Sequence, residues 1–319
     1  MLRPFGPSDC QHAAEIWNAA CGPDLAITSR LAEFNARAAT GAVQAGCLAI
    51  RDGQPIGFVS ASAMPADPTV SSPQVGWIDA LAVLPAFQRQ GIGSQMLDWA
   101  EAWLAEQGCQ RARLGGGLHH YVAGLPIELN TLACFDKRGY HERPGGSHAW
   151  DVAHDLAEYQ IPDPKYQLPN TEIRPARPDD YDAVLTFLQR EFPGRWRFEF
   201  QEYARDGGRC SDYVILRTER GVDGCARVAF EDSAWPLDHY YPNRLPHLWG
   251  QLGSIGISAD CRGKGYGGAL LDAGLRCLQE RGVRGCVIDW TGLVDFYGKF
   301  GFKPYRQYTM LIKQLTNVE

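Results

Sequence analysis

Apolar residues recur at helical spacing in two stretches of this chain, and each stretch follows a short apolar segment and a glycine-rich loop. The first is made of Met96, Leu97, Ala100 and Leu104, and the second of Leu270, Leu271, Leu275 and Leu278. Such spacing places the apolar side chains on one face of a helix. The preceding segments, 78–84 and 252–257, are typical of buried strands. The pattern therefore predicts strand, loop and helix in each half.

The remaining pattern also predicts the same order of elements in both halves. A helix through Ala13, Ile16, Trp17 and Ala20 opens the first half, and one through Val184, Leu185 and Leu188 opens the second. The possible N-caps are Asp9 or Ser8 for the first helix and Asp179 or Asp180 for the second. Two antiparallel hairpins follow, formed by segments 47–51 and 56–61 and by segments 213–218 and 225–230.

The two loops carry the same glycine signature. The first consists of Gln88, Arg89, Gln90, Gly91, Ile92 and Gly93, and the second of Arg262, Gly263, Lys264, Gly265, Tyr266 and Gly267. Backbone N–H groups at a helix N-terminus converge on an anion, and glycines let a phosphate approach the backbone closely. Glycine also serves ordinary turns, so a single copy would be weak evidence. Two copies in matching places predict two phosphate-binding loops.

Two further pairs of blocks show that the repeat covers most of the chain. Arg3-Pro4-x-x-Pro7-x-Asp9 reappears 171 residues later as Arg174-Pro175-x-x-Pro178-x-Asp180, and the loops are 174 residues apart. Lys137-x-Gly139-Tyr140 matches Lys299-x-Gly301-Phe302 at an offset of 162. Three blocks in one order indicate a duplication. We expect a domain over residues 1–154, a proline-rich linker over 155–170 and a second domain over 171–319.

Composition supports two ordinary folded domains in a reducing compartment. The 319 residues are 45% hydrophobic and 21% charged, which is enough for two cores. A net charge of −6 does not favour a nucleic-acid partner. The ten cysteines form no Cys-x-x-Cys pair, so we expect reduced thiols. No apolar run reaches the length of a signal peptide core or of a membrane span, so we expect a cytoplasmic protein without a membrane partner.

The repeated blocks resemble the GCN5-related N-acetyltransferase (GNAT) superfamily. Its hallmark is Gln/Arg-x-x-Gly-x-Gly/Ala after a strand, followed later by a helix end similar to Phe296-Tyr297-Gly298-Lys299-Phe300-Gly301-Phe302. The resemblance implies an α/β (α+β) fold of two tandem domains, each a twisted mixed, mostly antiparallel sheet flanked by helices. It also implies that the glycine loops anchor acetyl-CoA, although the first loop could instead bind nothing and only support the fold.

The resemblance further assigns roles to the strand before each loop. In the superfamily this strand splays from its neighbour, and its free N–H groups hold the pantetheine arm and polarise the thioester carbonyl, as an oxyanion hole does. The residues at that position are Leu81, Ala82 and Val83 in the first half and Ile255, Gly256 and Ile257 in the second. Packing in the core is the simpler role of their side chains, and both roles are compatible.

Tyr297 matches the superfamily tyrosine that donates a proton to the departing CoA sulfur. A mere core aromatic is the alternative. The aligned residue of the first half is Phe135, which has no proton to donate. That half therefore uses another acid or water, or it does not catalyse. We expect the second half to be the catalyst.

The general base is less defined by the sequence. Trp77 and Gln251 align with a glutamate that the superfamily often uses, and neither is a base. Asp79, two residues after Trp77, and Asp289, at the end of an apolar run, are the candidates. A salt-bridged carboxylate is the alternative for Asp79, and a turn residue is the alternative for Asp289. An ordered water could also relay the proton, with no need of either carboxylate.

Two other features predict structure rather than chemistry. His119 and His120 follow three glycines without a spaced set of metal ligands, which favours a loop or a cleft rim. Trp99 and Trp103 have the spacing of a packed helix face. We expect no metal requirement.

The functional hypothesis is transfer of an acetyl group from acetyl-CoA to the primary amine of a small molecule or peptide. One alternative is a non-catalytic acyl-CoA-binding module that keeps both loops and lacks acid and base groups. Another is an acyltransferase that uses a longer acyl-CoA. A monomer and a homodimer are both compatible with two fused domains.

Overall fold

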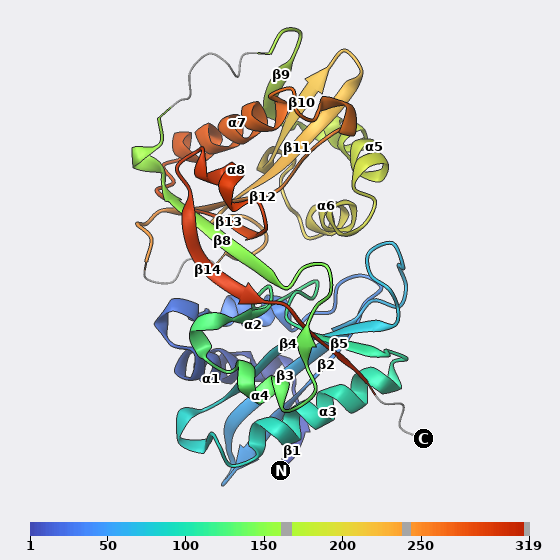
Figure 1. Ribbon diagram of the computed structural model, residues 1–319, viewed down its shortest axis with the longest axis vertical. Coiled ribbons are helices and arrows are strands. Elements are labelled where there is room, and N and C mark those ends of the chain that lie inside the picture. Colours follow the sequence, from blue (N-terminus) through green and yellow to red (C-terminus); the bar gives the residue numbers. More distant parts are fainter. Residues whose placement is uncertain (161–167, 238–243, 316–319) are drawn as a thin grey trace. The chain divides into compact units, whose positions relative to one another are not determined.

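The computed structural model describes residues 1–160, 168–237 and 244–315, and it divides the chain into two compact units. The first unit contains residues 1–150 together with the segment that follows residue 305. The second contains residues 151–237 and 244–305. Each unit has its own sheet, helices and hydrophobic core, which confirms the mixed α/β class and the duplication (Figure 1).

A seven-stranded sheet with the order β1-β2-β3-β4-β5-β15-β7 forms the centre of the first unit. Helix α3 packs on β3 and β4, and α1 also contacts these two strands. The first unit contains the elements β1 (Leu2–Pro4), α1 (Cys10–Cys21), α2 (Ser29–Asn35), β2 (Val43–Arg51), β3 (Gln54–Ala63), β4 (Val75–Val83), α3 (Ile92–Glu106), β5 (Arg111–Leu114), β6 (Leu125–Pro126), α4 (Leu132–Asp136), β7 (His141–Glu142) and β15 (Leu311–Gln314).

The other sheet has the order β6-β14-β8-β13-β12-β11-β10-β9. In the second unit, α7 packs on β11 and β12, while α5 contacts β11 and α6 contacts α5. The elements are β8 (His148–Asp155), β9 (Glu172–Pro175), α5 (Tyr181–Glu191), α6 (Arg195–Arg205), β10 (Tyr213–Thr218), β11 (Gly221–Phe230), β12 (Trp249–Ile257), α7 (Tyr266–Glu280), β13 (Gly285–Thr291), α8 (Val294–Gly298) and β14 (Lys303–Thr309).

The two repeats exchange strands. Strand β8 ends the first repeat in sequence but lies between β14 and β13 in the eight-stranded sheet. Strand β15 ends the second repeat but lies between β5 and β7 in the seven-stranded sheet. The compact units therefore differ from the segments 1–154 and 171–319, which stay a prediction about the duplicated sequence. Of the expected linker, residues 161–167 lie outside the described chain.

Both helices with apolar spacing carry the cores, as predicted. Leu104 of α3 and Leu271 of α7 are fully buried, and the other six residues of the two patterns are at most 3% exposed. Trp99 and Trp103 are half-buried and pack against the first core. The predicted hairpins are β2–β3 and β10–β11, each joined in antiparallel register. Periodicity thus located the packing faces because burial dominates the energetics of these elements.

The aspartates at the start of each repeat do not cap α1 and α5, contrary to the expectation. Asp9 and Asp180 occupy the N-cap positions, but neither side chain bonds to its helix. Instead, Asp9 accepts two hydrogen bonds of 2.7 and 2.8 Å from Arg3. Asp180 accepts bonds of 2.6 and 3.1 Å from Arg174. The first repeated block is therefore a bidentate ion pair that joins the first strand of a unit to its first helix.

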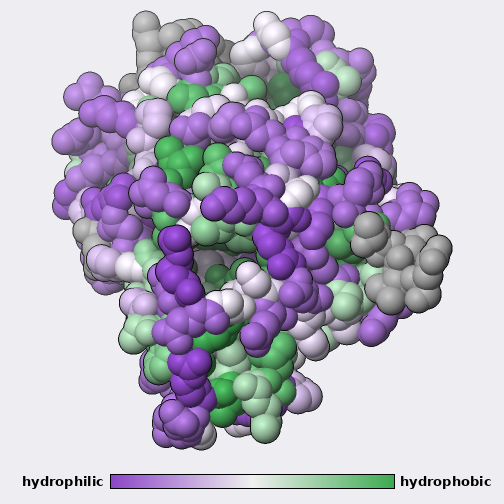
Figure 2. Space-filling model, turned by 60° about the horizontal axis from the view of Figure 1, so that its bottom comes forward, coloured by the Kyte–Doolittle hydropathy of each residue, from purple (hydrophilic) through white to green (hydrophobic). Residues whose placement is uncertain are grey.

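The surface is mainly polar on the face that Figure 2 draws, where hydrophobic residues form small separate groups among hydrophilic ones. Within the part of the chain that the structure describes, no helix is long and apolar enough to cross a membrane.

Candidate functional site

The two glycine loops have the same backbone conformation. In the first loop, Arg89 (φ 61°) and Gly91 (φ 81°) adopt the left-handed conformation, and in the second Gly263 (φ 73°) and Gly265 (φ 89°) do so. Arg89 corresponds to Gly263 in the repeat, and Gly91 corresponds to Gly265. Each loop ends in a left-handed N-cap glycine, after which α3 begins at Ile92 and α7 at Tyr266. Left-handed residues just before a helix N-terminus are typical of backbone that can bind an anion through successive N–H groups.

The loops leave room for an anion. A Cβ atom added at Gly91 or Gly263 would meet no atom within 4 Å, and one at Gly93 or Gly267 would meet only a methyl group at 3.8 Å. The glycines are therefore not required by packing within the protein. Open space above free N–H groups fits a pyrophosphate, so the residues present fit the CoA that the resemblance implies.

The strand before each loop splays from its parallel neighbour. The β12–β13 pairing covers Trp249 to Gln251 and goes no further, although β12 continues to Ile257. In the first unit, the β4–β5 pairing ends at Ile78, five residues before β4 ends. Register shifts against β3 and β11 show that both strands also contain a bulge near the split. The six strand residues assigned to pantetheine binding all lie beyond the split.

Asp289 lies at the split of the second unit. Its Oδ1 accepts a 2.6 Å hydrogen bond from Nε2 of Gln251, the last β12 residue that pairs with β13. Burial raises the pKa of Asp289, and the charge of Glu199 raises it further, while the Gln251 hydrogen bond and the Arg195 charge act in the opposite direction. A carboxylate with a raised pKa is a stronger base than a solvated one.

Tyr297 belongs to the same site. It lies in α8 and is 4% exposed, packed in the second core against Phe296 and Phe302. Burial and the nearby charge of Asp289 raise the pKa of Tyr297 to about 12, although a hydrogen bond with the Thr291 hydroxyl lowers it. The phenol therefore stays protonated at neutral pH. The predicted acid and the candidate base Asp289 share one unit and interact electrostatically.

Sequence reasoning missed the residues that surround Asp289. Arg195 and Glu199 form a 2.5 Å ion pair on α6, and the Arg195 guanidinium lies 4.8 Å from the centre of the Trp290 ring. Trp290 has a left-handed backbone (φ 47°), and its N–H donates a 3.0 Å hydrogen bond to the buried carboxylate of Asp151. An i, i+4 ion pair on a helix usually marks a solvated face, so the pattern alone gave no signal.

Aromatic rings cover the splayed strand on the α6 side. Phe192 and Trp196 lie 4.5 Å apart between ring centres. A Cβ atom at Gly256 would lie 2.5 Å from Phe192 and 2.8 Å from Trp196. The glycine thus lets both rings approach the backbone whose N–H groups are assigned to the thioester. Because side chains alternate along a strand, the flanking Ile255 and Ile257 pack on the opposite, α7-side core.

The corresponding region of the first unit is closed around Asp79. This residue is 2% exposed, and a Cβ atom at Gly117 would lie 1.9 Å from its Oδ1. Phe135, at the position of Tyr297, packs edge-on against Tyr140 with ring centres 5.7 Å apart. Asp79 therefore has backbone packed directly against its carboxylate, and the first unit places no phenol at the end of α4.

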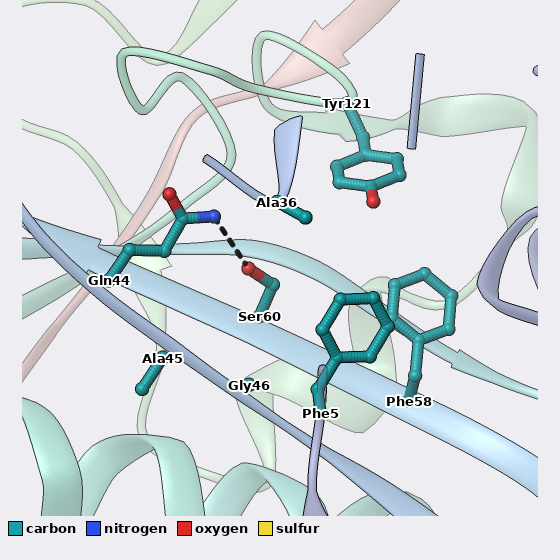
Figure 3. A pocket seen from close by; sticks show the side chains of 8 residues that line it. All are labelled: Phe5, Ala36, Gln44, Ala45, Gly46, Phe58, Ser60 and Tyr121. Carbon is teal, nitrogen blue, oxygen red and sulfur yellow. Dashed lines mark hydrogen bonds between the residues drawn. The ribbon is translucent and has the colours of Figure 1, made fainter. Parts of the chain in front are cut away.

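Two cavities accompany the sites. A cavity of about 90 Å³ in the first unit is lined by Phe5, Ala36, Gln44, Ala45, Gly46, Phe58, Ser60 and Tyr121 (Figure 3). It is smaller than the roughly 300–1,000 Å³ of typical ligand pockets. A polar cavity of about 350 Å³ adjoins the second loop, and Lys264, Tyr266 and Arg220 are among its lining residues. The larger cavity thus belongs to the unit that contains Tyr297.

The two histidines lie in a loop, as expected. His119 contacts the ring of Phe34 at 4.4 Å between centres, and its Nδ1 lies 2.7 Å from the Arg37 carbonyl oxygen. Within residues 1–160, 168–237 and 244–315, no group of three or more His, Cys, Asp or Glu residues could hold a metal ion.

Known proteins share both the sequence family and the tandem fold. Mycothiol acetyltransferase of Corynebacterium glutamicum is 25% identical over 233 residues, which is 70% of each chain. A region of a fungal multi-domain protein, described as a GCN5-related glucosamine N-acetyltransferase region, superposes with a TM-score of 0.84 at 23% identity. That match covers 98% of this chain and 38% of the longer fungal chain.

A tandem GNAT protein from the clavulanic acid biosynthesis pathway superposes with a TM-score of 0.70 at 13% identity, over 100% of this chain and 99% of its own. These structural likenesses establish the fold. The model of the acetyltransferase (GNAT) family matches residues 12–122 and 181–302, one region in each repeat. With two such regions, two glycine loops and two splayed strands, this chain belongs to the acetyltransferase (GNAT) family, whose acyl donor is acetyl-CoA.

Proposed function

We propose that the second unit transfers an acetyl group from acetyl-CoA to a primary amine, with Asp289 as general base and Tyr297 as general acid. The observation that carries this proposal is the arrangement of these two side chains at the β12–β13 split. Burial raises the pKa of both groups, and the nearby charge of Asp289 raises the pKa of Tyr297 further. The first unit has Phe135 in place of the acid, so we assign it no acetyl transfer.

In the proposed reaction, the backbone N–H groups beyond the split hold the pantetheine arm and donate to the thioester carbonyl oxygen. Asp289 accepts a proton from the acceptor ammonium, and the free amine then attacks the carbonyl carbon. A C–N bond forms while the C–S bond breaks. Tyr297 donates its proton to the departing sulfur. The nitrogen carries two protons after the attack, and it loses one of them to solvent as the intermediate collapses to the amide. Tyr297 then regains a proton from solvent. An oxyanion donor contributes roughly 2.7–4 kcal/mol to lowering such a barrier.

For the acceptor, we propose an amino sugar. The surroundings of Asp289 combine the half-buried Trp290 ring, the Glu199 carboxylate and the Arg195 guanidinium. An aromatic face packs against the C–H groups of a sugar ring, and the charged groups bind hydroxyls. A structural relative is described as a glucosamine N-acetyltransferase region, and a sequence relative as mycothiol acetyltransferase. Both descriptions support the proposal without establishing it for this chain.

The direct test is CoA release from acetyl-CoA in the presence of glucosamine, with the product identified by mass spectrometry. Spermidine and a short peptide with a free N-terminus serve as comparison amines. We expect kcat/KM for glucosamine to exceed the others by at least about tenfold. Acetylation of the polyamine or peptide in preference to glucosamine would show that the acceptor is wrong while leaving the acetyltransferase role intact.

Two matched variants identify the catalytic unit. Gly93 and Gly267 are each the second residue of a helix, and each has open space at its Cβ position. Glutamate is favourable at a helix N-terminus, so Gly93→Glu and Gly267→Glu should fold normally. Its charge opposes a pyrophosphate at the same N–H groups. We expect Gly267→Glu to abolish turnover and Gly93→Glu to leave it intact, and the reverse pattern would place catalysis in the first unit.

A further inference from the structure

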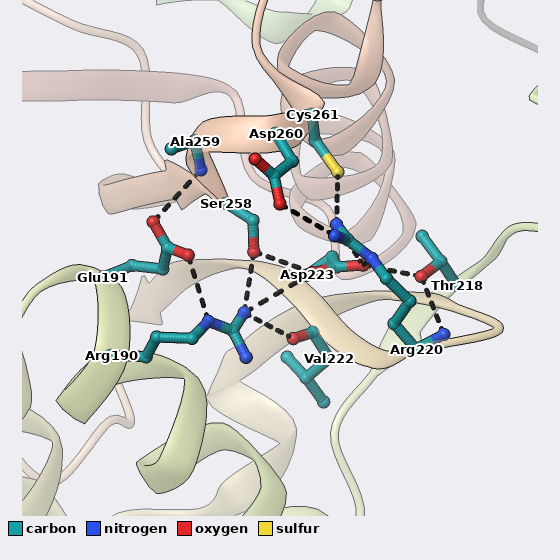
Figure 4. A network of polar contacts seen from close by, with 10 residues as sticks. All are labelled: Arg190, Glu191, Thr218, Arg220, Val222, Asp223, Ser258, Ala259, Asp260 and Cys261. Atoms are coloured by element: carbon teal, nitrogen blue, oxygen red, sulfur yellow. Dashed lines mark hydrogen bonds and ion pairs between the residues drawn. The ribbon is translucent and has the colours of Figure 1, made fainter.

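A buried polar network supports the turn that leads into the second glycine loop. Asp223 on β11 and Ser258 at the end of β12 are 2% and 1% exposed, and the Ser258 hydroxyl donates a 2.7 Å hydrogen bond to Asp223 Oδ1. Arg190 of α5 donates to the Ser258 oxygen at 2.8 Å, and Thr218 donates to Asp223 Oδ2 at 2.6 Å. Figure 4 shows these side chains converging from α5, the β10–β11 hairpin and the turn.

The network also fixes the residues between Ser258 and the loop. Arg220 donates to Oδ2 of Asp260 at 2.9 Å and lies 3.1 Å from Oδ2 of Asp223. The Ala259 N–H donates a 3.0 Å hydrogen bond to Glu191. Ala259 and Asp260, the two residues that follow Ser258 in the turn, are therefore held by side chains of other elements. The chain passes from this turn directly to Arg262 and the glycine loop.

The first unit makes the same turn without a buried carboxylate or hydroxyl at the two matching positions. Its polar contacts come from the amides of Gln88 and Gln90, which donate to the Val83 and Ala86 carbonyls at 2.9 and 3.1 Å. Its N–H group at Leu84 donates a 2.9 Å hydrogen bond to the Ile56 carbonyl, as the N–H of Ser258 donates at 2.7 Å to the Asp223 carbonyl. Register confirms the match, because Gly57 faces Val83 and Gly224 faces Ile257. An apolar pair, Ile56 and Leu84, thus occupies the place of the buried Asp223 and Ser258.

This comparison shows that the turn can form without the buried Asp223 and Ser258, so their network has a role other than folding the turn. A buried carboxylate is costly unless it is well paired, whereas an isoleucine at the same place is not. Burial alone would raise the pKa of Asp223, but the hydrogen bonds from Thr218 and Ser258 and the Arg220 charge lower it below its usual value. The turn therefore forms both with the apolar pair of the first unit and with the polar network of the second. The polar network adds hydrogen bonds from three elements to a turn that, in the first unit, is held by packing and by the amides of Gln88 and Gln90.

We propose that Asp223, Ser258 and Arg190 are positioning residues that hold the 258–261 turn in the conformation needed by the second glycine loop, so that acetyl-CoA binds tightly to the second unit. This inference rests on the proposed function. The network touches the turn and not the splayed N–H groups or Asp289, so it acts on the affinity for acetyl-CoA and not on the chemical step.

The test transplants the apolar pair of the first unit into the second. The double variant Asp223→Ile/Ser258→Leu removes the network and keeps a pairing that the chain already uses. Acetyl-CoA binding is measured by calorimetry in a Gly93→Glu background, so that heat reports on the second loop. We expect Kd to rise about tenfold, within the range that a misplaced binding group costs. KM for acetyl-CoA should rise in parallel, with kcat and the acceptor KM unchanged.

Two controls keep the test decisive. Arg284→Ala removes an exposed bidentate ion pair with Asp155, with both bonds at 2.9 Å, and should leave the acetyl-CoA Kd unchanged. If the double variant does not fold, Arg190→Ala and Arg220→Ala replace it, since both side chains are half-exposed and their loss leaves no cavity in the core.

The outcomes distinguish the two proposals. Absence of acetyl-CoA binding in the unmodified protein would contradict the proposed function itself. Normal binding by the double variant, or by both arginine variants, would overturn only the positioning role. A loss of kcat at saturating acetyl-CoA would also overturn it, because the network would then act on the chemical step.

Discussion

Gln251 and Asp289 are joined by a 2.6 Å hydrogen bond where β12 and β13 separate, because Gln251 pairs with Val287 in the last step of the register and Asp289 lies two residues further along β13. The amide donates to Oδ1 and so leaves the second carboxylate oxygen to a proton on the acceptor. A Cβ atom at the neighbouring Gly253 would lie 3.5 Å from both the Asp289 oxygen and the Gln251 nitrogen, so the missing side chain keeps this corner uncrowded. The proposed base is thereby held beside the strand that we propose to receive the thioester.

Replacing Asp289 with asparagine should remove the acidic limb of the pH–rate profile. The raised pKa of Asp289 means that the wild-type rate rises with pH through a value above that of an ordinary carboxyl group. We expect kcat/KM of Asp289→Asn to fall by roughly 10²–10⁴ and to lose this limb. Asp295→Asn, an exposed acid on α8, is the matched control. If the pH–rate profile of Asp289→Asn kept its acidic limb, the base would be another group.

Replacing Tyr297 with phenylalanine should slow release of CoA without weakening its binding. The ring remains packed in the core, so only the proton donor is lost. We expect kcat to fall by roughly 10²–10⁴, with the acetyl-CoA Kd within twofold of the wild type. Because the pKa of Tyr297 is about 12, the wild-type rate should show no basic limb from this group below about pH 11.

The control for that experiment is Tyr159→Phe. Tyr159 is also buried in the second core, and its hydroxyl donates a 2.7 Å hydrogen bond to Asp272. It therefore reports the effect of losing one buried hydroxyl group. Equal losses of kcat in the two variants would reduce Tyr297 to a structural aromatic.

Asp180 should stabilise the protein above pH 4 and cease to do so as the pH falls toward 2. The hydrogen bonds from Arg174 hold its pKa at about 2, below the roughly 3.9 of an unfolded chain. Its contribution is therefore present above the unfolded value and is lost on acidification through the folded one. We expect Asp180→Asn to lower the free energy of unfolding by about 2–3 kcal/mol at pH 7.

Urea unfolding at pH 7 and pH 3 measures this effect. The difference between wild type and Asp180→Asn should shrink at the lower pH, while the exposed Asp179→Asn should show little difference at either pH. A pH-independent difference would mean that Asp180 acts through packing and not through its charge.

Replacing Leu311 with alanine should destabilise the first unit. Leu311 is 2% exposed in β15 and belongs to the first core, although it lies in the last ten residues of the chain. We expect a loss of about 2–5 kcal/mol, with faster hydrogen exchange in β5 and α3 than in α7. Leu293→Ala, at a residue that is 60% exposed, is the control. Faster exchange confined to α7 would contradict the exchange of strands.

The sequence predicted the parts of the site that depend on local pattern. Both loops and both long helices follow from repeated glycines and apolar spacing, whereas Tyr297 follows from the resemblance to the superfamily and Asp289 from its place at the end of an apolar run. It did not predict Asp151, because the strand that carries it belongs to one repeat in sequence and to the other in space. It also gave no sign that Asp223 replaces Ile56, since a hairpin aspartate usually belongs to a turn.

The exchange of strands also has a consequence for synthesis of the protein on the ribosome. Strand β5 has β4 on one side and β15 on the other, and Lys313 forms a 2.6 Å ion pair with Glu101 across 212 positions. Until residues 311–314 leave the exit tunnel, the nascent first unit presents an open sheet edge beside a nearly complete core. Such edges pair readily with other chains. The protein should therefore depend on protection by a chaperone until β15 has emerged from the ribosome.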